Sequence, residues 1–156
     1  LAVARHHVLD FVQNIDVSVI EHDARLVEAI AALPGRKLVF TNADIPYAAR
    51  VLDRLGLAHA FEVIHDIHAT GYLPKPDPRA YAGLCDAYGI DPARALFAED
   101  MARNLPPAHA IGMTTVWINN GSEQGPGADL AAFIDFEISD LSDWLHAVAA
   151  TLETNA

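Results

Sequence analysis

Helix-like and strand-like patterns of apolar residues alternate along this chain. In several stretches apolar residues recur every three or four positions, as on one face of a helix, while short continuous apolar runs between them are typical of buried strands. Glycine or proline follows many of these stretches, where either residue tends to end a regular element. The pattern predicts helices over residues 23–33, 45–55, 78–88, 104–111 and 139–148, and strands over residues 37–40, 61–67, 95–98, 114–118 and 133–138.

Strands that alternate with helices through short connections predict an α/β fold with a doubly wound, Rossmann-like parallel sheet. Residues 21–156 fit this scheme, with a turn-rich and mobile surface loop expected over residues 119–127. Residues 1–20 fit it poorly, because their apolar side chains are spaced to face a helical partner. We therefore expect an α/β core over residues 21–156, preceded by the end of a separate helical segment over residues 1–20.

Composition and charge narrow the class of protein. The chain has 156 residues, 52% of them hydrophobic, which is enough for one sizeable core. Its formal net charge of −11 disfavours a nucleic-acid-binding surface, which needs clustered Lys and Arg. No apolar run reaches the length of a membrane span. Cys85 is the single cysteine, so no internal disulfide can form, and the reducing cytoplasm is the expected location.

Three groups of polar residues follow apolar runs, where the carboxyl ends of strands are expected. Thr41 and Asn42 come first, then Lys75 between two prolines, then Glu99 and Asp100. Ligands of open parallel sheets bind at that edge. Hydroxyl, ammonium and carboxylate groups gathered there suit a phosphoryl group and a divalent cation. Mg²⁺ is the expected ion, because it keeps several waters and needs only one or two protein carboxylates.

Each group also has a structural interpretation that the sequence leaves open. Thr41 or Asn42 could cap the helix that follows, and the Glu99–Asp100 pair could cap the next one. Lys75 could be a solvated lysine in a loop beside a helix start. Two carboxylates directly after a buried strand are costly unless a cation or hydrogen-bond donors meet them, which favours the metal role for the acidic pair.

Taken in order, these residues resemble three motifs of the haloacid dehalogenase superfamily of hydrolases. Residues 37–42 (KLVFTN) look like its second motif, an apolar strand that ends in Thr or Ser. Residues 74–78 (PKPDP) are similar to the third motif, which supplies a lysine, and residues 97–105 (FAEDMARNL) to the fourth, acidic motif. Within the superfamily, the acidic motif most resembles pyrimidine 5′-nucleotidase-like members. The three motifs together are far more specific than any one of them.

The resemblance implies a magnesium-dependent reaction through an aspartate nucleophile, and it implies roles for the residues at matching positions. Thr41 and Asn42 would hold the phosphoryl group of a small phosphorylated substrate. Lys75 would orient the nucleophile and neutralise charge. Asp100 matches the metal-binding position, and Glu99 stands beside it where many members carry glycine.

The chain departs from the family's pattern in two further places. Asn104 stands where many members carry another acid, and we expect it to contact the substrate. The first motif, with the nucleophilic aspartate and an acid–base aspartate, has no match, because no Asp-x-Asp-x-Thr stretch occurs. We expect the chain to begin inside the family's helical cap, with residues 1–20 as its last part, and to be inactive alone. The absent strand would lie between the strands ending at Thr41 and Asp100, where a homodimer partner or a swapped segment could fill the slot.

The leading hypothesis is a magnesium-dependent phosphatase acting on a small phosphomonoester such as a pyrimidine 5′-nucleotide. A haloacid dehalogenase is the alternative within the fold, although it does not need the metal that Glu99 and Asp100 suggest. A catalytically dead binding module is the non-enzyme alternative. A response-regulator receiver also collects Asp, Thr and Lys-Pro at strand ends, but its acidic pair comes first, whereas Thr41 and Lys75 precede Asp100 here.

Overall fold

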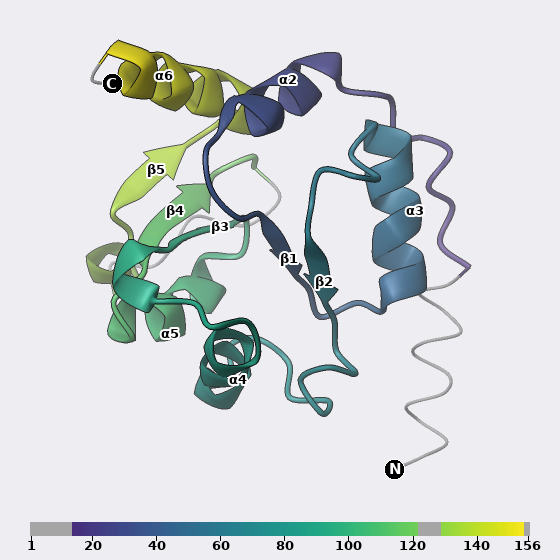
Figure 1. Cartoon of the computed structure of the whole chain (residues 1–156). Helices are drawn as coiled ribbons and strands as arrows, with labels where there is room; N and C mark the ends of the chain where they lie inside the picture. The colour runs from purple at the N-terminus through teal and green to yellow at the C-terminus, as the bar shows by residue number, and fades with distance from the viewer. Residues whose placement is uncertain (1–13, 122–128, 155–156) are drawn as a thin grey trace. The chain divides into compact units, whose positions relative to one another are not determined.

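The computed structural model describes residues 14–121 and 129–154 (Figure 1). The chain divides into two compact units: unit 1 is Leu1–Tyr72 with Val148–Ala156, and unit 2 is Leu73–Ala147. Both units contain parallel strands joined through helices. In chain order the described elements are α2 (Ala24–Ala32), β1 (Leu38–Phe40), α3 (Ile45–Leu55), β2 (Val63–His65), α4 (Pro78–Tyr88), β3 (Leu96–Glu99), α5 (Leu105–Ala110), β4 (Thr114–Ile118), β5 (Phe136–Ile138) and α6 (Leu141–Thr154), with short 3₁₀ helices at Pro92–Arg94, Ala102–Asn104 and Ala131–Phe133.

Unit 1 is built on the parallel strand pair β1–β2. Phe40, the last residue of β1, lies opposite His65, the last residue of β2, so both strands end at the same edge. Helix α3 packs against β2 and lies beside it in Figure 1. The loop after β1 and the turn after β2 therefore leave the sheet side by side.

The bounds of α3 follow from the chemistry of its ends. The carboxylate of Asp44 accepts a hydrogen bond from the N–H of Tyr47 at 3.0 Å, which satisfies one of the free donors of the first turn. Pro46 lies in that turn, where its missing N–H costs nothing. Gly56 ends the helix in the left-handed region, with φ of 85°.

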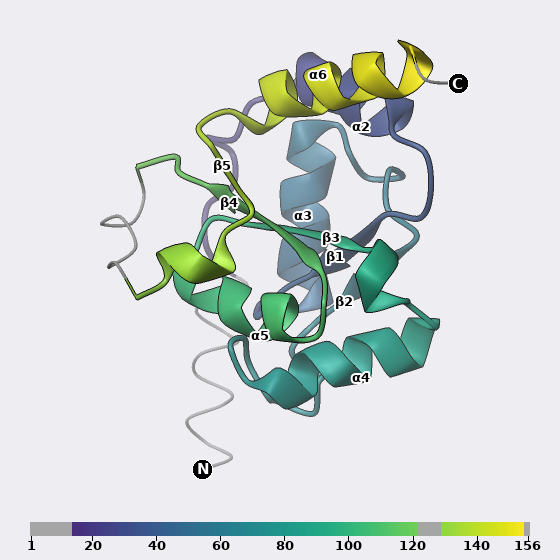
Figure 2. The same cartoon turned by 90° about the vertical axis from the view of Figure 1, so that its left-hand side faces the viewer.

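Unit 2 is built on a three-stranded parallel sheet in the order β3–β4–β5. The register places Glu99 at the end of β3 opposite Trp117 of β4. Helix α5 packs against β3 and β4, and α4 packs against α5. Figure 2 shows both helices on one side of these strands. One cluster of the unit's core consists of three buried residues and three partly buried ones around them: Ala102, Leu105 and Trp117, with Phe97, Leu130 and Ile134.

The predicted α/β class and the parallel strands are confirmed, but the described strands form two sheets in place of one doubly wound sheet. Two strands are shorter than expected: the run at 61–67 becomes Val63–His65, and the run at 133–138 becomes Phe136–Ile138. The second is shortened because Ala131–Phe133 forms a 3₁₀ helix. Of the segment predicted as a cap remnant, residues 14–20 contain turns and no helix. Residues 1–13 and most of the expected mobile loop lie outside the described residues.

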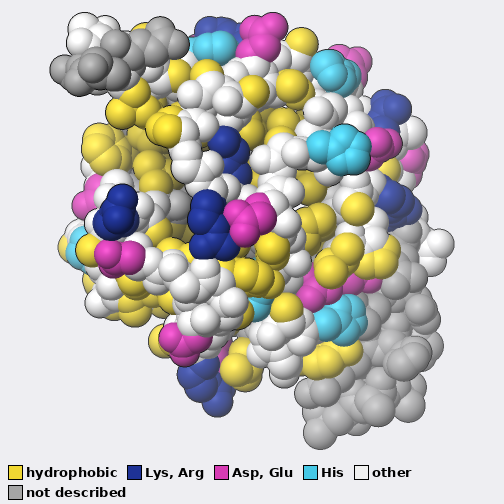
Figure 3. Space-filling model, viewed as in Figure 1, with side chains coloured by type: hydrophobic (Ala, Val, Ile, Leu, Met, Phe, Trp, Pro, Cys, Tyr) yellow, Lys and Arg dark blue, Asp and Glu magenta, His cyan; other side chains and the backbone are white. Residues whose placement is uncertain are grey.

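Two surface properties bear on possible partners. In the described part of the chain, no helix is long and apolar enough to cross a membrane. On the face shown in Figure 3, Lys and Arg side chains lie singly or beside Asp and Glu side chains. Ion pairs of this kind include Arg36–Glu62 and Arg79–Asp77. Such mixing differs from the continuous basic stripe that a nucleic-acid-binding surface requires.

Candidate active site

Lys75 and Glu99 form a buried ion pair in unit 2. The ammonium Nζ of Lys75 contacts Oε2 of Glu99, and the two side chains are only 9% and 7% exposed. The ring of Phe97 also lies under the ammonium, with its centroid 5.4 Å from Nζ, a cation–π contact. The interpretation of Lys75 as a solvated loop lysine is therefore wrong.

Both carboxylate oxygens of Glu99 are engaged. Oε2 meets Lys75, and Oε1 accepts the N–H of Met101 at 3.3 Å. Burial raises the pKa of Glu99, the charge of Lys75 opposes that rise, and the adjacent carboxyl of Asp100 adds to it. A charged Glu99 at this depth therefore depends on the lysine that meets it.

Asp100 follows Glu99 on the loop that leaves β3, and its side chain is partly exposed. Its main-chain carbonyl accepts a hydrogen bond from Nε1–H of Trp117 at 2.9 Å. The 3₁₀ helix that comes next has Met101 as its N-cap residue, without a side-chain capping bond. The interpretation of the acidic pair as a helix cap is therefore wrong.

Asn104 closes the same loop and is buried, with 2% of its surface exposed. Among the described residues, its Oδ1 has no hydrogen-bond partner. Its main-chain carbonyl accepts the hydroxyl proton of Tyr81 at 2.6 Å. The substrate contact expected of Asn104 stays a prediction, since the side chain is covered within unit 2.

A divalent cation would find one partly exposed carboxylate here, that of Asp100. The part of the chain that the structure describes has no group of three or more His, Cys, Asp or Glu that could hold a metal ion. Mg²⁺ tolerates so few protein ligands because it keeps several waters. Asp100 fits that role, whereas Glu99 would have to give up its contact with Lys75 or with the N–H of Met101 to bind the ion. Metal binding by Glu99 and Asp100 stays a prediction.

Thr41 and Asn42 follow β1 in unit 1. The N–H of Thr41 donates to the carbonyl of His65 at 3.0 Å, and its Oγ1 accepts the N–H of Ala43 at 3.0 Å. The hydroxyl proton of Thr41 can therefore be donated to another group, and Asn42 is exposed. Because Asp44 caps α3, the interpretation of Thr41 or Asn42 as its cap is wrong.

Sequence reasoning missed Asp66, a buried acid in the turn beside this loop. Its Oδ1 accepts the N–H groups of His68 and Ala69 at 3.1 and 2.9 Å. Its Oδ2 accepts the N–H of Ile45 at 3.2 Å and lies 2.8 Å from Nδ1 of His68. Burial would raise the pKa of Asp66, but these hydrogen bonds outweigh burial and lower it. The signal was the one used for Glu99, an acid directly after an apolar run.

The predicted site residues fall into both units. Thr41 and Asn42 belong to unit 1, and Lys75 and the acidic pair belong to unit 2. The structure brings Lys75 and Glu99 together, and Asp100 follows Glu99 directly in the sequence. The approach of Thr41 to this group stays a prediction.

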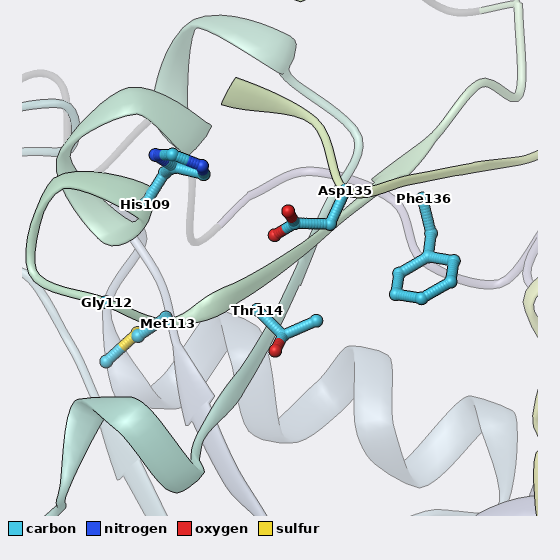
Figure 4. Close-up of a pocket in the computed structure, with 6 residues that line it drawn as sticks. All are labelled: His109, Gly112, Met113, Thr114, Asp135 and Phe136. Atoms are coloured by element: carbon cyan, nitrogen blue, oxygen red, sulfur yellow. The ribbon is translucent and has the colours of Figure 1, made fainter. Parts of the chain in front are cut away.

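A separate hollow of about 540 Å³ opens in unit 2 at the other end of the strands (Figure 4). Thr114 begins β4 and Asp135 directly precedes β5, so the hollow lies at the amino ends of these strands. Figure 4 shows the carboxylate of Asp135 pointing toward the side where His109 lies. This carboxylate accepts the N–H of Thr115 at 2.8 Å and lies 3.0 Å from its hydroxyl oxygen, and both contacts lower the pKa of Asp135. The hollow is therefore distinct from the candidate active site around Lys75 and Glu99, which lies at the carboxyl end of β3.

Comparison with solved structures places this fold among dehalogenases and phosphatases. A dehalogenase solved with a reaction intermediate matches with a TM-score of 0.68 and 22% identity, over 81% of this chain and 56% of that one. A phosphatase of the same superfamily from Thermococcus onnurineus matches with a TM-score of 0.64 and 22% identity, over 83% and 57%. At this level of identity the likeness defines the fold alone.

The family follows from the sequence. The model of the haloacid dehalogenase-like hydrolases matches residues 3–112, and the chain belongs to this family. Phosphoglycolate phosphatase of Rhodospirillum rubrum is 33% identical over 77% of this chain and 50% of its own length. N-acetylmuramic acid 6-phosphate phosphatase of Pseudomonas aeruginosa is 31% identical over 74% and 55%. GMP/IMP nucleotidase of Escherichia coli is 30% identical over 56% and 39%. The chain thus spans about half the length of the first two relatives.

Proposed function

We propose that the full-length protein hydrolyses small phosphomonoesters with the help of Mg²⁺. The observation that carries the proposal is the buried Lys75–Glu99 pair beside the partly exposed Asp100, at the carboxyl end of β3. A lysine fixed there can offset negative charge on a phosphoryl group. The names of the relatives, two phosphatases and a nucleotidase, support the same class of reaction.

In this proposal five of the predicted residues have a task, and the substrate contact of Asn104 stays a prediction. Thr41 and Asn42 donate hydrogen bonds to phosphoryl oxygens, as the free hydroxyl proton of Thr41 allows. Lys75 neutralises charge at the reacting phosphoryl group, and Glu99 holds the lysine in place. Asp100 binds the metal ion, which neutralises phosphoryl charge and polarises a phosphoryl oxygen when it is bound.

The nucleophile in this proposal is an aspartate outside the chain, because the chain contains no Asp-x-Asp-x-Thr stretch. Its carboxylate oxygen bonds to phosphorus while the bond from phosphorus to the substrate's ester oxygen breaks, and the leaving alcohol takes a proton from an acid group. Water then attacks the phosphorus, which releases inorganic phosphate and restores the carboxylate. We accordingly expect this chain to be inactive alone. A strand from a second copy or a swapped segment would complete it.

We propose a pyrimidine 5′-nucleotide as the first substrate to test. This choice depends on the likeness of residues 97–105 to pyrimidine 5′-nucleotidase-like members, while the three relatives are named for other phosphomonoesters. The test panel therefore contains UMP and CMP together with GMP, phosphoglycolate and N-acetylmuramic acid 6-phosphate.

The test is phosphate release by the full-length protein with Mg²⁺ and after chelation with EDTA. We expect turnover of at least one ester with Mg²⁺, and a loss of roughly a hundredfold or more in Asp100→Asn, as for other removed electrostatic groups. Asp86→Asn is the matched control, because Asp86 is exposed on α4. Turnover that persists at full rate in EDTA contradicts the proposal. Halide release from a 2-haloacid without phosphate release would show a dehalogenase, and binding without turnover would show a binding module.

A further inference from the structure

We infer that Tyr81 and Trp117 are positioning residues for Asp100, an inference that rests on the proposed function. Both aromatic residues are buried, with 0% and 2% of their surface exposed. Their spacing in the sequence suits core packing alone. In the structure, however, each also donates its one polar hydrogen to the loop that carries the acidic pair.

The two hydrogen bonds hold the loop at two points. Nε1–H of Trp117 donates to the carbonyl of Asp100 at 2.9 Å, and the hydroxyl of Tyr81 donates to the carbonyl of Asn104 at 2.6 Å. Trp117 belongs to β4 and Tyr81 to α4, so the loop is tied to two different elements. Without Trp117, the carbonyl of Asp100 would lose this donor and turn toward water, which would move the Asp100 side chain. The carbonyl of Asn104 lies at the N-cap of α5, where it also accepts a helix hydrogen bond, so the loss of the Tyr81 hydroxyl would release the end of the loop from α4 without leaving this carbonyl unsatisfied.

Tyr81 also supports the lysine side of the site. Its ring meets Phe97 edge to face, with centroids 5.7 Å apart, and the Phe97 ring lies under the ammonium of Lys75. Burial and the charge of Glu99 raise the pKa of Tyr81, so its hydroxyl stays protonated and donates. Tyr81 thus holds the loop that carries Glu99 and Asp100, and it also packs against Phe97, which contacts Lys75.

A metal-binding carboxylate is sensitive to such support. Groups that orient a ligand without touching the ion typically change metal affinity or activity by 10- to 100-fold when they are removed. Because Trp117 acts through the main chain of Asp100 and Tyr81 through that of Asn104 in the same loop, we expect their loss to weaken Mg²⁺ binding and turnover more than substrate binding.

The experiment compares Tyr81→Phe and Trp117→Phe with matched controls in the full-length protein. Tyr88→Phe removes a hydroxyl from the same helix, and Trp144→Phe changes the other of the two tryptophans. Mg²⁺ affinity is measured by calorimetric titration without substrate, and kcat and KM are measured with the best ester at saturating Mg²⁺. We expect Tyr81→Phe and Trp117→Phe to bind Mg²⁺ roughly tenfold more weakly and to lose kcat with little change in KM. The controls should match the wild type.

The outcomes separate this inference from the proposed function. If Tyr81→Phe, which keeps the ring and the packing, binds Mg²⁺ and turns over like Tyr88→Phe, the inference is overturned while the phosphatase stands. A wild type that binds no Mg²⁺ also overturns the inference. A wild type that binds Mg²⁺ with the expected order of variants but hydrolyses no ester would overturn the proposed function and support the positioning role.

Discussion

Lys75 meets Glu99 across 24 residues of sequence, and each side chain is more than nine-tenths buried. Neither charge has enough water around it to be stable alone. The pair is therefore a structural unit of unit 2 as well as the centre of the candidate site. The contribution of this ion pair to the free energy of unfolding can be measured without knowing the substrate.

Removing one partner of this pair should be more damaging than removing both. Lys75→Met and Glu99→Leu should each lower the free energy of unfolding by about 3 kcal/mol, because each leaves a buried charge alone. The double variant should lose clearly less than the sum. Urea unfolding of the four proteins gives this double-mutant cycle, and additive losses would contradict the prediction. Arg36→Met, which breaks the exposed pair with Glu62, is the control and should leave the free energy of unfolding nearly unchanged, because solvent screens that pair.

Asp66 should be important for the stability of unit 1. Asp66→Ala removes the acceptor of three main-chain N–H groups, those of Ile45, His68 and Ala69, and should cost about 3 kcal/mol in urea unfolding. Because its pKa is lowered in the folded protein, the stability that Asp66 contributes is present above the ordinary value of 3.8 and is lost as the pH falls below it. Asp53→Ala, at an exposed position of α3, should be near neutral. Equal losses in the two variants would contradict this role.

His65 should make the protein less stable in weak acid. Burial lowers the pKa of His65, although the charge of Asp66 opposes the effect. The unfolded chain therefore binds a proton near pH 6.5, whereas the folded chain binds it only at lower pH. The free energy of unfolding then falls as the pH drops below about 6.5, by at most about 1.4 kcal/mol per pH unit. Urea unfolding between pH 7.5 and 5.5 should show a smaller slope in His65→Phe. His59→Phe, at an exposed position, is the control and should keep the dependence of the free energy of unfolding on pH. If His65→Phe keeps it too, protonation of His65 is not its cause.

Thr115 should stabilise unit 2 through its hydroxyl group. The side chain is fully buried, donates to the carbonyl of Phe133 at 2.8 Å and lies 3.0 Å from the carboxylate of Asp135. Thr115→Val keeps the volume and removes both contacts, so it should cost about 1–3 kcal/mol. Thr114→Val, one residue earlier and exposed, should change stability by less than about 0.5 kcal/mol. Thermal unfolding compares the two, and equal melting temperatures would refute the assignment.

The elements with strong end signals could be predicted from the sequence. The bounds of α3 match residues 45–55 because Gly56 marks its end and the apolar spacing is regular over three turns. The first strand was also found, since residues 38–40 form a continuous apolar run. The strand at Thr114–Ile118 was found because β-branched and aromatic residues are continuous there. A gap between the strands ending at Thr41 and Asp100 was expected from the missing first motif, but the order of strands within each sheet could not be predicted, because apolar runs give no information on their neighbours.

The site was only partly readable from the sequence. The sequence predicted that Lys75 and the acidic pair would gather at the carboxyl ends of the strands, but no local pattern shows that Lys75 pairs directly with Glu99. Asp66 was missed because the predicted strand over residues 61–67 places it inside the strand, whereas β2 ends at His65 and leaves Asp66 in the turn. The hydrogen bonds of Trp117 and Tyr81 could not be predicted, since spacing locates the apolar part of an aromatic side chain and says nothing about its polar atom.

Unit 1 takes its residues from both ends of the chain, because the last part of helix α6, from Val148 onward, belongs to it while the first part of the helix belongs to unit 2. No single proteolytic cut yields both units whole, and a fragment that stops at Tyr72 would lack the segment that completes unit 1.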